Sequence, residues 1–371
     1  MPKDKVNVAV IGAGMIANAG HIRAWKQQPE VEVVGVADKV QENAAATARR
    51  HQIPHAFTDV ARMLAELRPD VVSVCTPNHY HKEHTIAALQ AGAHVLCEKP
   101  AATTHADALA MFQAADAAGK VLLVAQSLRF SHPIAAAQRF VAAGHLGEIY
   151  HAEAALWRRR GVPTWGLFHM KAHSDGGPLL DLGAHMLDAL LWMMGNPKVV
   201  AASGMTYTKL ADRDEGLVTS LAESGAFAGV FNPRPYDYRE FDVEDLAVAF
   251  LRLANDATIT VKVSWAANVP DSAGGTLLLG TEGGLRLGAV DLALSVVKNM
   301  SGYQVDITPK VPPGPPDNPF YGHVTLAAHL LRVIRGEEKL IVRREEVLNV
   351  IRALEAVYRS AAERREVRLE E

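Results

Sequence analysis

The stretch VNVAVIGAGMIA, Val6 to Ala17, decides the fold of this chain. Its first half is apolar and largely β-branched, which predicts a buried parallel strand, and its second half predicts a tight glycine turn that leads into a helix. Gly12 and Gly14 are needed at the turn because a Cβ would block the backbone from approaching a pyrophosphate. The exposed N–H groups of the helix N-terminus would then face that anion.

A carboxylate follows the next predicted strand. Residues 31–37 are apolar and end at Asp38, about 20 residues past the turn, where a carboxylate can accept hydrogen bonds from a ribose. Ala17 is small enough to let the helix pack closely on the strand. A glycine turn alone is a weak signal and could belong to another α/β protein. Placed between strand and helix, with an acid after the second strand, it predicts a dinucleotide-binding site.

Composition limits the class of protein. The chain has 371 residues, which suits two domains, and its formal net charge of −3 gives no electrostatic case for nucleic acid. The two cysteines, Cys75 and Cys97, end apolar runs, so we expect buried thiols in a reducing compartment. The longest apolar helix, near residues 179–194, is interrupted by charged side chains and does not reach membrane length. We expect a cytoplasmic protein without a membrane partner.

Strands and helices alternate in the first third of the chain. Helices are predicted at 41–52, 59–67 (with Thr58 able to cap it), 81–91 and 104–118, and further strands at 71–75, 94–97 and 121–125. Counting 121–125 as the sixth strand, this alternation predicts a Rossmann-type, doubly wound parallel sheet. The predicted dinucleotide-binding domain covers residues 1–125.

The pattern changes after residue 125. Strand-like runs follow one another without intervening helices, which favours an antiparallel sheet in an α+β domain over residues 126–371. The predicted elements are helices at 133–142, 177–195, 321–335 and 344–364, strands at 149–160, 199–208, 246–253, 258–265 and 276–279, and an extended proline-rich loop at 311–319.

Polar residues follow two strands on the side where a doubly wound sheet binds its ligands. Thr76-Pro77-Asn78 follows the fourth strand, and Glu98-Lys99-Pro100 follows the fifth. Most lysines are solvated surface groups. Lys99 differs because it directly follows an apolar strand and precedes a proline. Its ammonium could bond a substrate hydroxyl and favour the alkoxide that develops as a hydride leaves.

Asp181 and His185 form the second candidate constellation. They are four residues apart in a helical stretch, so they share one helix face. They could simply satisfy each other in a core. Alternatively, His185 is a proton acceptor, since its ordinary pKa lies near neutrality, and Asp181 orients it or binds substrate. Alcohol oxidation needs this division, with a hydride passing to a nicotinamide and a proton to a nearby base.

The motifs GxGxxA at 12–17, TPN at 76–78, EKP at 98–100 and GGxxxDxGxH at 176–185 resemble those of the Gfo/Idh/MocA oxidoreductases. The resemblance runs from residue 6 to residue 369. It implies an NAD(P)-dependent dehydrogenase or reductase of sugars and cyclitols, with a C-terminal domain built on an open, mainly antiparallel sheet that also forms dimer or tetramer contacts. It implies that Lys99, Asp181 and His185 are catalytic.

The resemblance also implies the cofactor contacts. These fall on Gly12, Gly14, Met15, Ile16, Asp38, Thr76, Asn78, His81 and Glu98, to which we add Lys39, Pro77, Lys99 and Gln126. Asp38 would oppose a 2′-phosphate, so we expect NAD to be preferred. Lys39 could swing toward that phosphate, so NADP use is possible.

One departure bears on the substrate. Members of the family often carry Trp-Arg before the histidine motif, whereas here Trp165 precedes a glycine and the nearest cations are Arg158, Arg159, Arg160 and Lys171. We expect Arg158, Trp165 and Lys171 to contact substrate beside the catalytic residues. Residues 158–160 could instead form a solvated edge strand whose charged side chains prevent pairing with another chain. If an arginine of this segment lies in the substrate cleft, its guanidinium would suit a substrate that carries a carboxylate, phosphate or sulfonate.

Two further hypotheses stay open. One is cleavage of a glycoside by transient oxidation and elimination with bound NAD; the other is a sensor that only binds dinucleotide, against which the intact Lys99, Asp181 and His185 argue. We expect no metal site, because His79, His81 and His84 lack a cysteine or carboxylate at a ligand spacing. His81 is expected over the cofactor instead.

Overall fold

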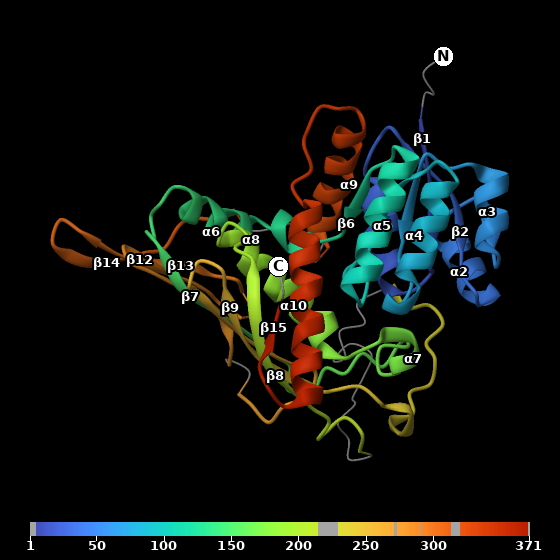
Figure 1. Cartoon of the computed structure of the whole chain (residues 1–371). Coiled ribbons are helices and arrows are strands. Elements are labelled where there is room, and N and C mark those ends of the chain that lie inside the picture. The colour runs from blue at the N-terminus through green and yellow to red at the C-terminus, as the bar shows by residue number, and fades with distance from the viewer. Residues whose placement is uncertain (1–4, 214–228, 271–272, 290, 313–319, 370–371) are drawn as a thin grey trace.

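The computed structural model describes residues 5–213, 229–270, 273–289, 291–312 and 320–369. A parallel sheet flanked by helices lies on the right of Figure 1, and a larger sheet extends to the left. The long helix α10 (Arg344–Glu363) runs between them. No helix in the described ranges is both long and apolar enough to span a bilayer.

The first sheet has six strands in the order β3-β2-β1-β4-β5-β6, and all its pairings are parallel. This order confirms the predicted doubly wound Rossmann sheet. The sequence pattern does not locate β3, because this short edge strand carries exposed residues and lacks an apolar run. The strands are β1 (Val6–Ile11), β2 (Val31–Ala37), β3 (His55–Phe57), β4 (Val71–Val74), β5 (His94–Cys97) and β6 (Leu122–Val124).

The glycine turn is fixed by close backbone packing. Gly12 has φ +96°, and a Cβ there would lie 2.6 Å from the carbonyl oxygen of Cys75. Gly14 has no heavy atom within 4 Å of an added Cβ, so it faces open space, as a turn that receives a ligand must. The helix that follows begins with a π-helical turn, η1 (Ala17–His21), before α1 (Ile22–Lys26). Such turns occur frequently at functional sites.

The other helices of this layer match the predicted ones closely. One cap differs: Asp59, not Thr58, caps α3, because its side chain accepts a hydrogen bond from the backbone N–H of Arg62 at 3.0 Å. Thr104 caps α5 in the same way. The helices are α2 (Gln41–His51), α3 (Val60–Leu67), η2 (Asn78–Tyr80), α4 (His81–Gln90) and α5 (His105–Ala118).

Among the described residues, the second sheet has nine strands in the order β14-β13-β12-β11-β7-β10-β9-β8-β15. All pairings are antiparallel except β7 with β10, so the prediction of a mainly antiparallel sheet is confirmed. The strands are β7 (Ile149–Trp157), β8 (Val199–Tyr207), β9 (Leu246–Leu253), β10 (Thr258–Ser264), β11 (Gly275–Gly280), β12 (Gly283–Leu287), β13 (Leu294–Met300), β14 (Tyr303–Ile307) and β15 (Val367–Arg368).

Strand β7 is shorter than predicted. It ends at Trp157 because the chain turns there, and Arg158 donates from its guanidinium to the carbonyl oxygen of Gly161 at 3.2 Å. The expectation that residues 158–160 alternate along a strand is therefore wrong. The proline-rich loop falls mostly on residues 313–319, which lie outside the described residues.

Two helices join the sheets. Helix α9 (Tyr321–Ile334) packs Leu326 and Leu330 into the core of the parallel sheet, although it comes late in the sequence. Helix α10 presents Ile351 to that core and Leu354 to the core of the second sheet. The division at residue 125 stays a prediction. The remaining helices are η3 (Ser127–Phe130), α6 (His132–Ala142), α7 (Lys171–Ser174), η4 (Leu179–Gly183), α8 (Ala184–Met193) and η6 (Tyr238–Glu240).

A buried arginine ties three of these helices together. Arg129 of η3 donates to both carboxylate oxygens of Asp188 of α8, at 2.8 and 2.6 Å, and to Glu346 of α10 at 2.5 Å. All three side chains are at most 3 % exposed. Two carboxylates and one guanidinium satisfy one another here, which fixes α8 and α10 relative to η3.

Candidate active site

An ion pair lies at the carboxyl end of β5. The ammonium of Lys99 donates to the Oδ1 atom of Asp181 at 2.9 Å and to its backbone oxygen at 3.0 Å. The indole Nε1 of Trp265 donates to the other carboxylate oxygen of Asp181 at 2.9 Å. The side chains of Lys99 and Asp181 are 12 % and 15 % exposed, so the pair is largely buried yet reachable. The structure thus joins two of the three residues expected to be catalytic by hydrogen bonds, and the third, His185, is near enough for both charges to act on its pKa.

The carboxylate of Asp181 is ionised. Burial by itself would raise its pKa, but the Lys99 ammonium, the nearby Arg158 guanidinium and the Trp265 hydrogen bond outweigh burial and hold the pKa below its ordinary value. With both oxygens occupied by fixed donors, Asp181 holds the Lys99 ammonium in place. Sequence patterns give no sign of Trp265, since β10 and η4 meet only in the folded chain.

His185 is the second residue of α8, directly after η4. The structure shows no hydrogen bond between His185 and Asp181 in the described part of the chain, so the predicted i,i+4 contact is not formed. A π-helical turn over Leu179–Gly183 changes the register that an α-helix would give. Burial and the Lys99 charge lower the pKa of His185 to about 3, although Asp181 opposes this shift. The imidazole is therefore neutral at physiological pH, and its buried Nδ1 atom has no partner among the described residues.

Next to Lys99, Glu98 is buried between two histidines. Its Oε1 atom accepts from Nε2 of His21 at 2.9 Å and from Nε2 of His323 at 3.1 Å. Its Oε2 atom accepts from the backbone N–H of Lys99 at 3.1 Å. Among the described residues, these three side chains are the one His and carboxylate group spaced to hold a metal ion, but their hydrogen bonds account for the spacing. The sequence gives no signal for His21 or His323, which come from η1 and α9.

The glycine turn and Asp38 fit a dinucleotide. Asp38 follows β2, and its two carboxylate oxygens accept from the backbone N–H groups of Ala13 and Val40, each at 2.8 Å. The carboxylate is thereby fixed beside the turn. At the other strand ends, Thr76 and Gln126 each bury a side-chain oxygen that has no partner among the described residues. Because buried polar atoms are normally paired, these oxygens favour a ligand on this edge.

The remaining expected cofactor residues also lie at this edge, with different surroundings. Met15 and Ile16 start the helix after the turn, Pro77 precedes η2, and Lys39 is exposed beside Asp38. The amide of Asn78 donates to the backbone oxygen of Ser174 at 2.9 Å, which ties the β4 loop to α7.

His81 lies at the same edge of the sheet, and both of its ring nitrogens have partners inside the protein. Its ring is buried, and its two nitrogens face the backbone oxygens of Pro100 at 2.7 Å and Thr76 at 2.8 Å. The helix that carries His81 turns its ring into the protein, and the expected contact of His81 with the cofactor stays a prediction. His81 also holds together the loops after β4 and β5.

The expected substrate residues are only partly brought together. Arg158 is close enough to Asp181 for its charge to lower the Asp181 pKa. Arg160 points elsewhere and donates to the side-chain oxygen of Asn268 at 3.0 Å. Trp165 is buried against the Phe168 ring, with centroids 6.0 Å apart. Lys171 lines a cavity of about 480 Å³ whose lining includes none of Lys99, Asp181 and His185.

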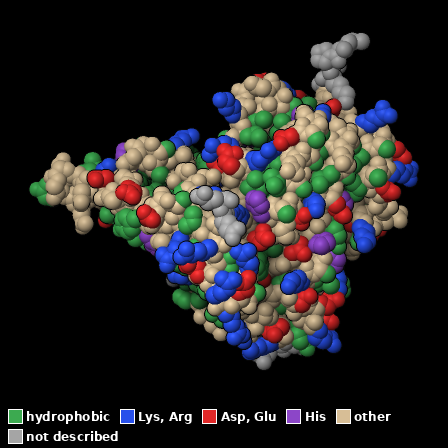
Figure 2. Space-filling view, viewed as in Figure 1, with side chains coloured by type: hydrophobic (Ala, Val, Ile, Leu, Met, Phe, Trp, Pro, Cys, Tyr) green, Lys and Arg blue, Asp and Glu red, His purple; other side chains and the backbone are tan. Residues whose placement is uncertain are grey.

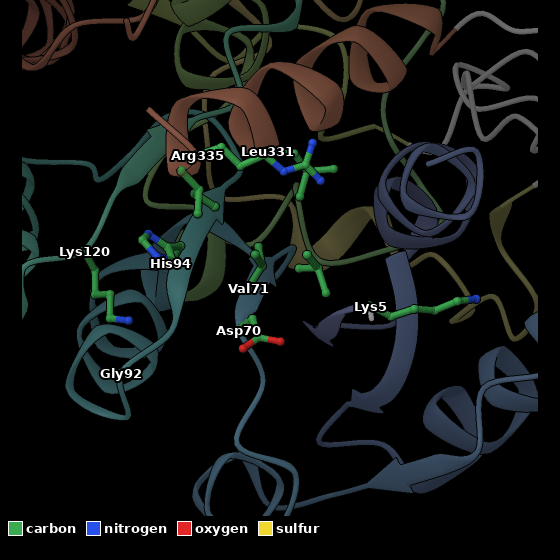
Figure 3. Close-up of a pocket in the computed structure, with 10 residues that line it drawn as sticks. Lys5, Asp70, Val71, Gly92, His94, Lys120, Leu331 and Arg335 are labelled. Carbon is green, nitrogen blue, oxygen red and sulfur yellow. The ribbon is translucent and has the colours of Figure 1, made fainter. Parts of the chain in front are cut away.

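Another cavity lies at the far end of the parallel sheet. It encloses about 250 Å³ and is shown in Figure 3 with Lys5, Asp70, His94, Lys120 and Arg335 around it. Its walls come from the amino ends of β1, β4 and β5. Ligands of doubly wound sheets bind at the opposite, carboxyl ends, so this cavity is not the candidate active site.

Comparison with known proteins agrees with this geometry. A family model described as "Oxidoreductase family, NAD-binding Rossmann fold" matches residues 6–126, and one described as "GFO/IDH/MocA C-terminal domain" matches residues 134–286. The chain is 36 % identical over 269 residues to D-glucoside 3-dehydrogenase of Escherichia coli (strain K12), covering 72 % of this chain and 73 % of that protein.

Two more distant relatives cover more of the chain. A scyllo-inositol 2-dehydrogenase (NADP(+)) of Bacillus subtilis (strain 168) is 25 % identical over 392 residues, which is 99 % of this chain and 97 % of the relative. A solved structure of levoglucosan dehydrogenase in complex with NADH superposes with a TM-score of 0.82 at 22 % identity, covering 99 % of this chain and all of that chain. At that identity the likeness describes the fold.

Proposed function

This chain belongs to the Gfo/Idh/MocA oxidoreductase family, and from that premise we propose that it is a dehydrogenase that transfers a hydride between NAD and a ring hydroxyl of a glucoside or a related sugar or cyclitol. The chain is an oxidoreductase with an NAD-binding Rossmann domain. The observation that carries the finer proposal is the buried Lys99–Asp181 pair beside a neutral His185, at the strand ends where the cofactor binds.

Lys99 binds the hydroxyl oxygen in this scheme. An ammonium has three N–H donors, and two of those on Lys99 are directed at Asp181. The third remains for a substrate oxygen, whose developing negative charge it stabilises. Asp181 and Trp265 keep the ammonium in one position, so little reorganisation is needed when the charge develops.

His185 accepts the hydroxyl proton. It is neutral because burial and the Lys99 charge lower its pKa to about 3. As alkoxide character develops on the substrate, this negative charge offsets the Lys99 charge, so the basicity of His185 rises at the moment when the proton must leave. A nicotinamide bound at the strand ends supplies the hydride acceptor.

The substrate class rests on the relatives and on the site. The relative at 36 % identity is named a D-glucoside 3-dehydrogenase, and others are named for inositol, apiose and levoglucosan. All these names describe polyhydroxylated rings or sugars. Arg158 adds a second cation beside Asp181 that can donate to a neighbouring substrate oxygen.

We propose NAD as the preferred cofactor because of Asp38. Its carboxylate is fixed beside the turn by two backbone N–H groups, where a 2′-phosphate would bring like charges together. Lys39 is exposed next to it and can offset part of this repulsion.

We also propose a homodimer or homotetramer that forms through the second sheet. Leu277, Val297, Met300 and Tyr303 of β11, β13 and β14 are large apolar residues that are 36–74 % exposed. The β13–β14 hairpin reaches the left tip of the molecule in Figure 1, where apolar side chains are visible in Figure 2. By the strand register, Leu277 and Val297 lie on one face of the sheet and Met300 and Tyr303 on the other. Large apolar residues left exposed on a sheet favour association of two copies.

A substrate screen tests the proposed reaction. The protein is mixed with NAD or NADP and a panel of glucosides, free sugars and cyclitols, and the absorbance of the reduced nicotinamide is followed together with the ketone product. Reduced cofactor stoichiometric with ketone is the expected result. Release of the aglycone without accumulation of reduced cofactor would indicate glycoside cleavage, and no turnover with any member in either direction would contradict the proposal.

A further inference from the structure

The cluster of His21, Glu98 and His323 is assembled from three distant parts of the chain. His21 lies in η1, Glu98 directly follows β5, and His323 lies in α9. Their side chains are 0 %, 8 % and 7 % exposed. The two Nε2 atoms meet the same carboxylate oxygen, at 2.9 and 3.1 Å. A cluster this buried and this closely spaced has a defined protonation state.

Counting donors and acceptors identifies that state. Trp25 donates to the Ser73 hydroxyl oxygen at 2.7 Å, and that hydroxyl lies 3.1 Å from Nδ1 of His21, where it can either donate or accept. The pKa of Glu98 is held well below its ordinary value, so its carboxylate is ionised and can only accept from Nε2 of His21 at 2.9 Å. His21 therefore carries its proton on Nε2 and donates it to Glu98. His323 also donates from Nε2, and the backbone N–H of Lys99 donates to the other oxygen. Glu98 is thus an ionised carboxylate that accepts three N–H groups.

The Nδ1 atom of His323 is buried and has no partner among the described residues, so a second proton on this ring would leave an unpaired buried N–H group. The negative charge of the cluster therefore stays largely uncompensated within it. Burial lowers the pKa of His21, so its imidazole is neutral. Burial would raise the pKa of Glu98, but the hydrogen bonds from His21 and His323 hold it well below its ordinary value. Other titratable groups that interact with the Glu98 charge are neutral too, because burial raises the thiol pKa of Cys75 and Cys97 and lowers the imidazole pKa of His81.

Charged groups outside the cluster offset the negative charge of the Glu98 carboxylate only in part. Lys99 is paired with Asp181, and opposite charges this close largely cancel at a distance. His185 is neutral. Arg158 is half-exposed, so solvent screens it more than the buried Glu98.

Glu98 stands where the nicotinamide half of the cofactor belongs. The β1 turn receives the pyrophosphate and Asp38 the adenosine ribose, so the nicotinamide lies toward the ends of β4 and β5. The ring carries a positive charge in NAD and none in NADH. We propose that the His21–Glu98–His323 cluster sets the redox poise of the bound cofactor: its fixed negative charge favours NAD over NADH and thereby favours substrate oxidation.

This inference rests on the proposed function only in that the site binds a nicotinamide dinucleotide. The test is the ratio of the dissociation constants for NADH and NAD, each measured by calorimetry without substrate. For a unit charge at about 10 Å and an effective dielectric of about 20, removal of the charge changes the ratio roughly tenfold. We expect Glu98→Gln to lower the ratio of the dissociation constant for NADH to that for NAD by this factor. Glu153→Gln, a half-buried Glu paired with Lys262 in the second sheet, is the matched control and should leave the ratio unchanged.

Two substitutions of His323 give an independent test that also applies if Glu98→Gln fails to fold. The amide nitrogen of Gln stands where Nε2 stood, so His323→Gln keeps a donor to Glu98, whereas His323→Phe removes it. Losing the donor raises the pKa of Glu98, so the carboxylate takes up a proton as the pH falls. As the pH is lowered, the ratio of the dissociation constants for NADH and NAD should fall for His323→Phe. The same ratio should not change with pH for the native protein or for His323→Gln.

The outcomes separate the two proposals. If neither nucleotide binds the native protein, the proposed cofactor is wrong. If both bind and the ratio is the same in the native protein and Glu98→Gln, or is equally flat with pH in all His323 variants, the poising role is wrong and the proposed reaction is untouched.

Discussion

Breaking the Lys99–Asp181 pair should destabilise the protein more than removing both charges together. The two charged groups are 2.9 Å apart and 12 % and 15 % exposed, so either one alone would be left largely buried and unpaired. Loss of one partner from a buried pair costs about 3–5 kcal/mol, and the residual exposure here reduces this to about 2–4 kcal/mol. Asp181→Asn and Lys99→Met should each lose about that much.

The double variant Lys99→Met/Asp181→Asn measures the interaction between the two charged side chains. With both charges gone, the Asn oxygen still accepts from Trp265, and no buried charge is left unpaired. We therefore expect a coupling energy of about 2 kcal/mol in the free energy of unfolding, measured by urea denaturation of the native protein, both single variants and the double variant. Losses that add to within about 0.5 kcal/mol would refute the claim that these charges are coupled in the folded protein.

Three further predictions follow from the site and the second sheet. Burial and the Lys99 charge lower the pKa of His185 to about 3, so its imidazole stays unprotonated through the pH range in which a free histidine titrates. Protonation of His185 should therefore cause no fall in kcat/KM for oxidation between about pH 8 and pH 5. A fall in kcat/KM centred near pH 6.5 that disappears in His185→Ala would contradict this. Asp38 repels a 2′-phosphate by roughly 4 kcal/mol per unit charge at about 4 Å and an effective dielectric near 20, so kcat/KM should be higher with NAD than with NADP. Asp38→Ala should reduce this difference in kcat/KM between the two cofactors. A clear preference of the native enzyme for NADP would contradict the proposed role of Asp38. Light scattering at micromolar concentration should give the mass of a dimer or tetramer, and Tyr303→Arg should shift it toward the monomer, whereas a monomer mass for the native protein would exclude the proposed assembly.

Local signals explain why the first sheet could be predicted so fully. The glycine turn, Asp38 and Lys99 are each specified by a few consecutive residues at a strand end, and parallel strands bring such ends to one edge. The pairing of Asp181 with Lys99 does not follow from this reasoning, because Asp181 lies in η4 and not at a strand end, and only the family resemblance groups the two residues. Prediction from local sequence failed for β3, because its three mostly exposed residues show no alternation of apolar and polar side chains. It also failed for β12 to β14, because these strands are short and lie close to glycine-containing turns, so that their sequence resembles loops.

The rest of the site depends on contacts between distant segments. Trp265 reaches Asp181 only when β10 packs on η4, and His323 reaches Glu98 only when α9 returns to the first sheet. The missing Asp181–His185 contact has a local cause, the π-helical turn, but an α-helix is the usual expectation for such a sequence. His81 shows the same limit, since the sequence places it at the right edge but does not indicate its ring orientation.

Hydride transfer in Lys99→Ala and His185→Ala tests the central claim most directly. Each variant is mixed with saturating NAD and the best substrate of the screen, and formation of reduced nicotinamide is compared with that of the native enzyme, with nucleotide binding measured in parallel. Alkoxide stabilisation and proton transfer each contribute on the order of 100-fold or more, so we predict a loss of kcat of about that size with NAD binding largely retained. Turnover close to the native rate in either variant would remove that residue from the mechanism and contradict the account.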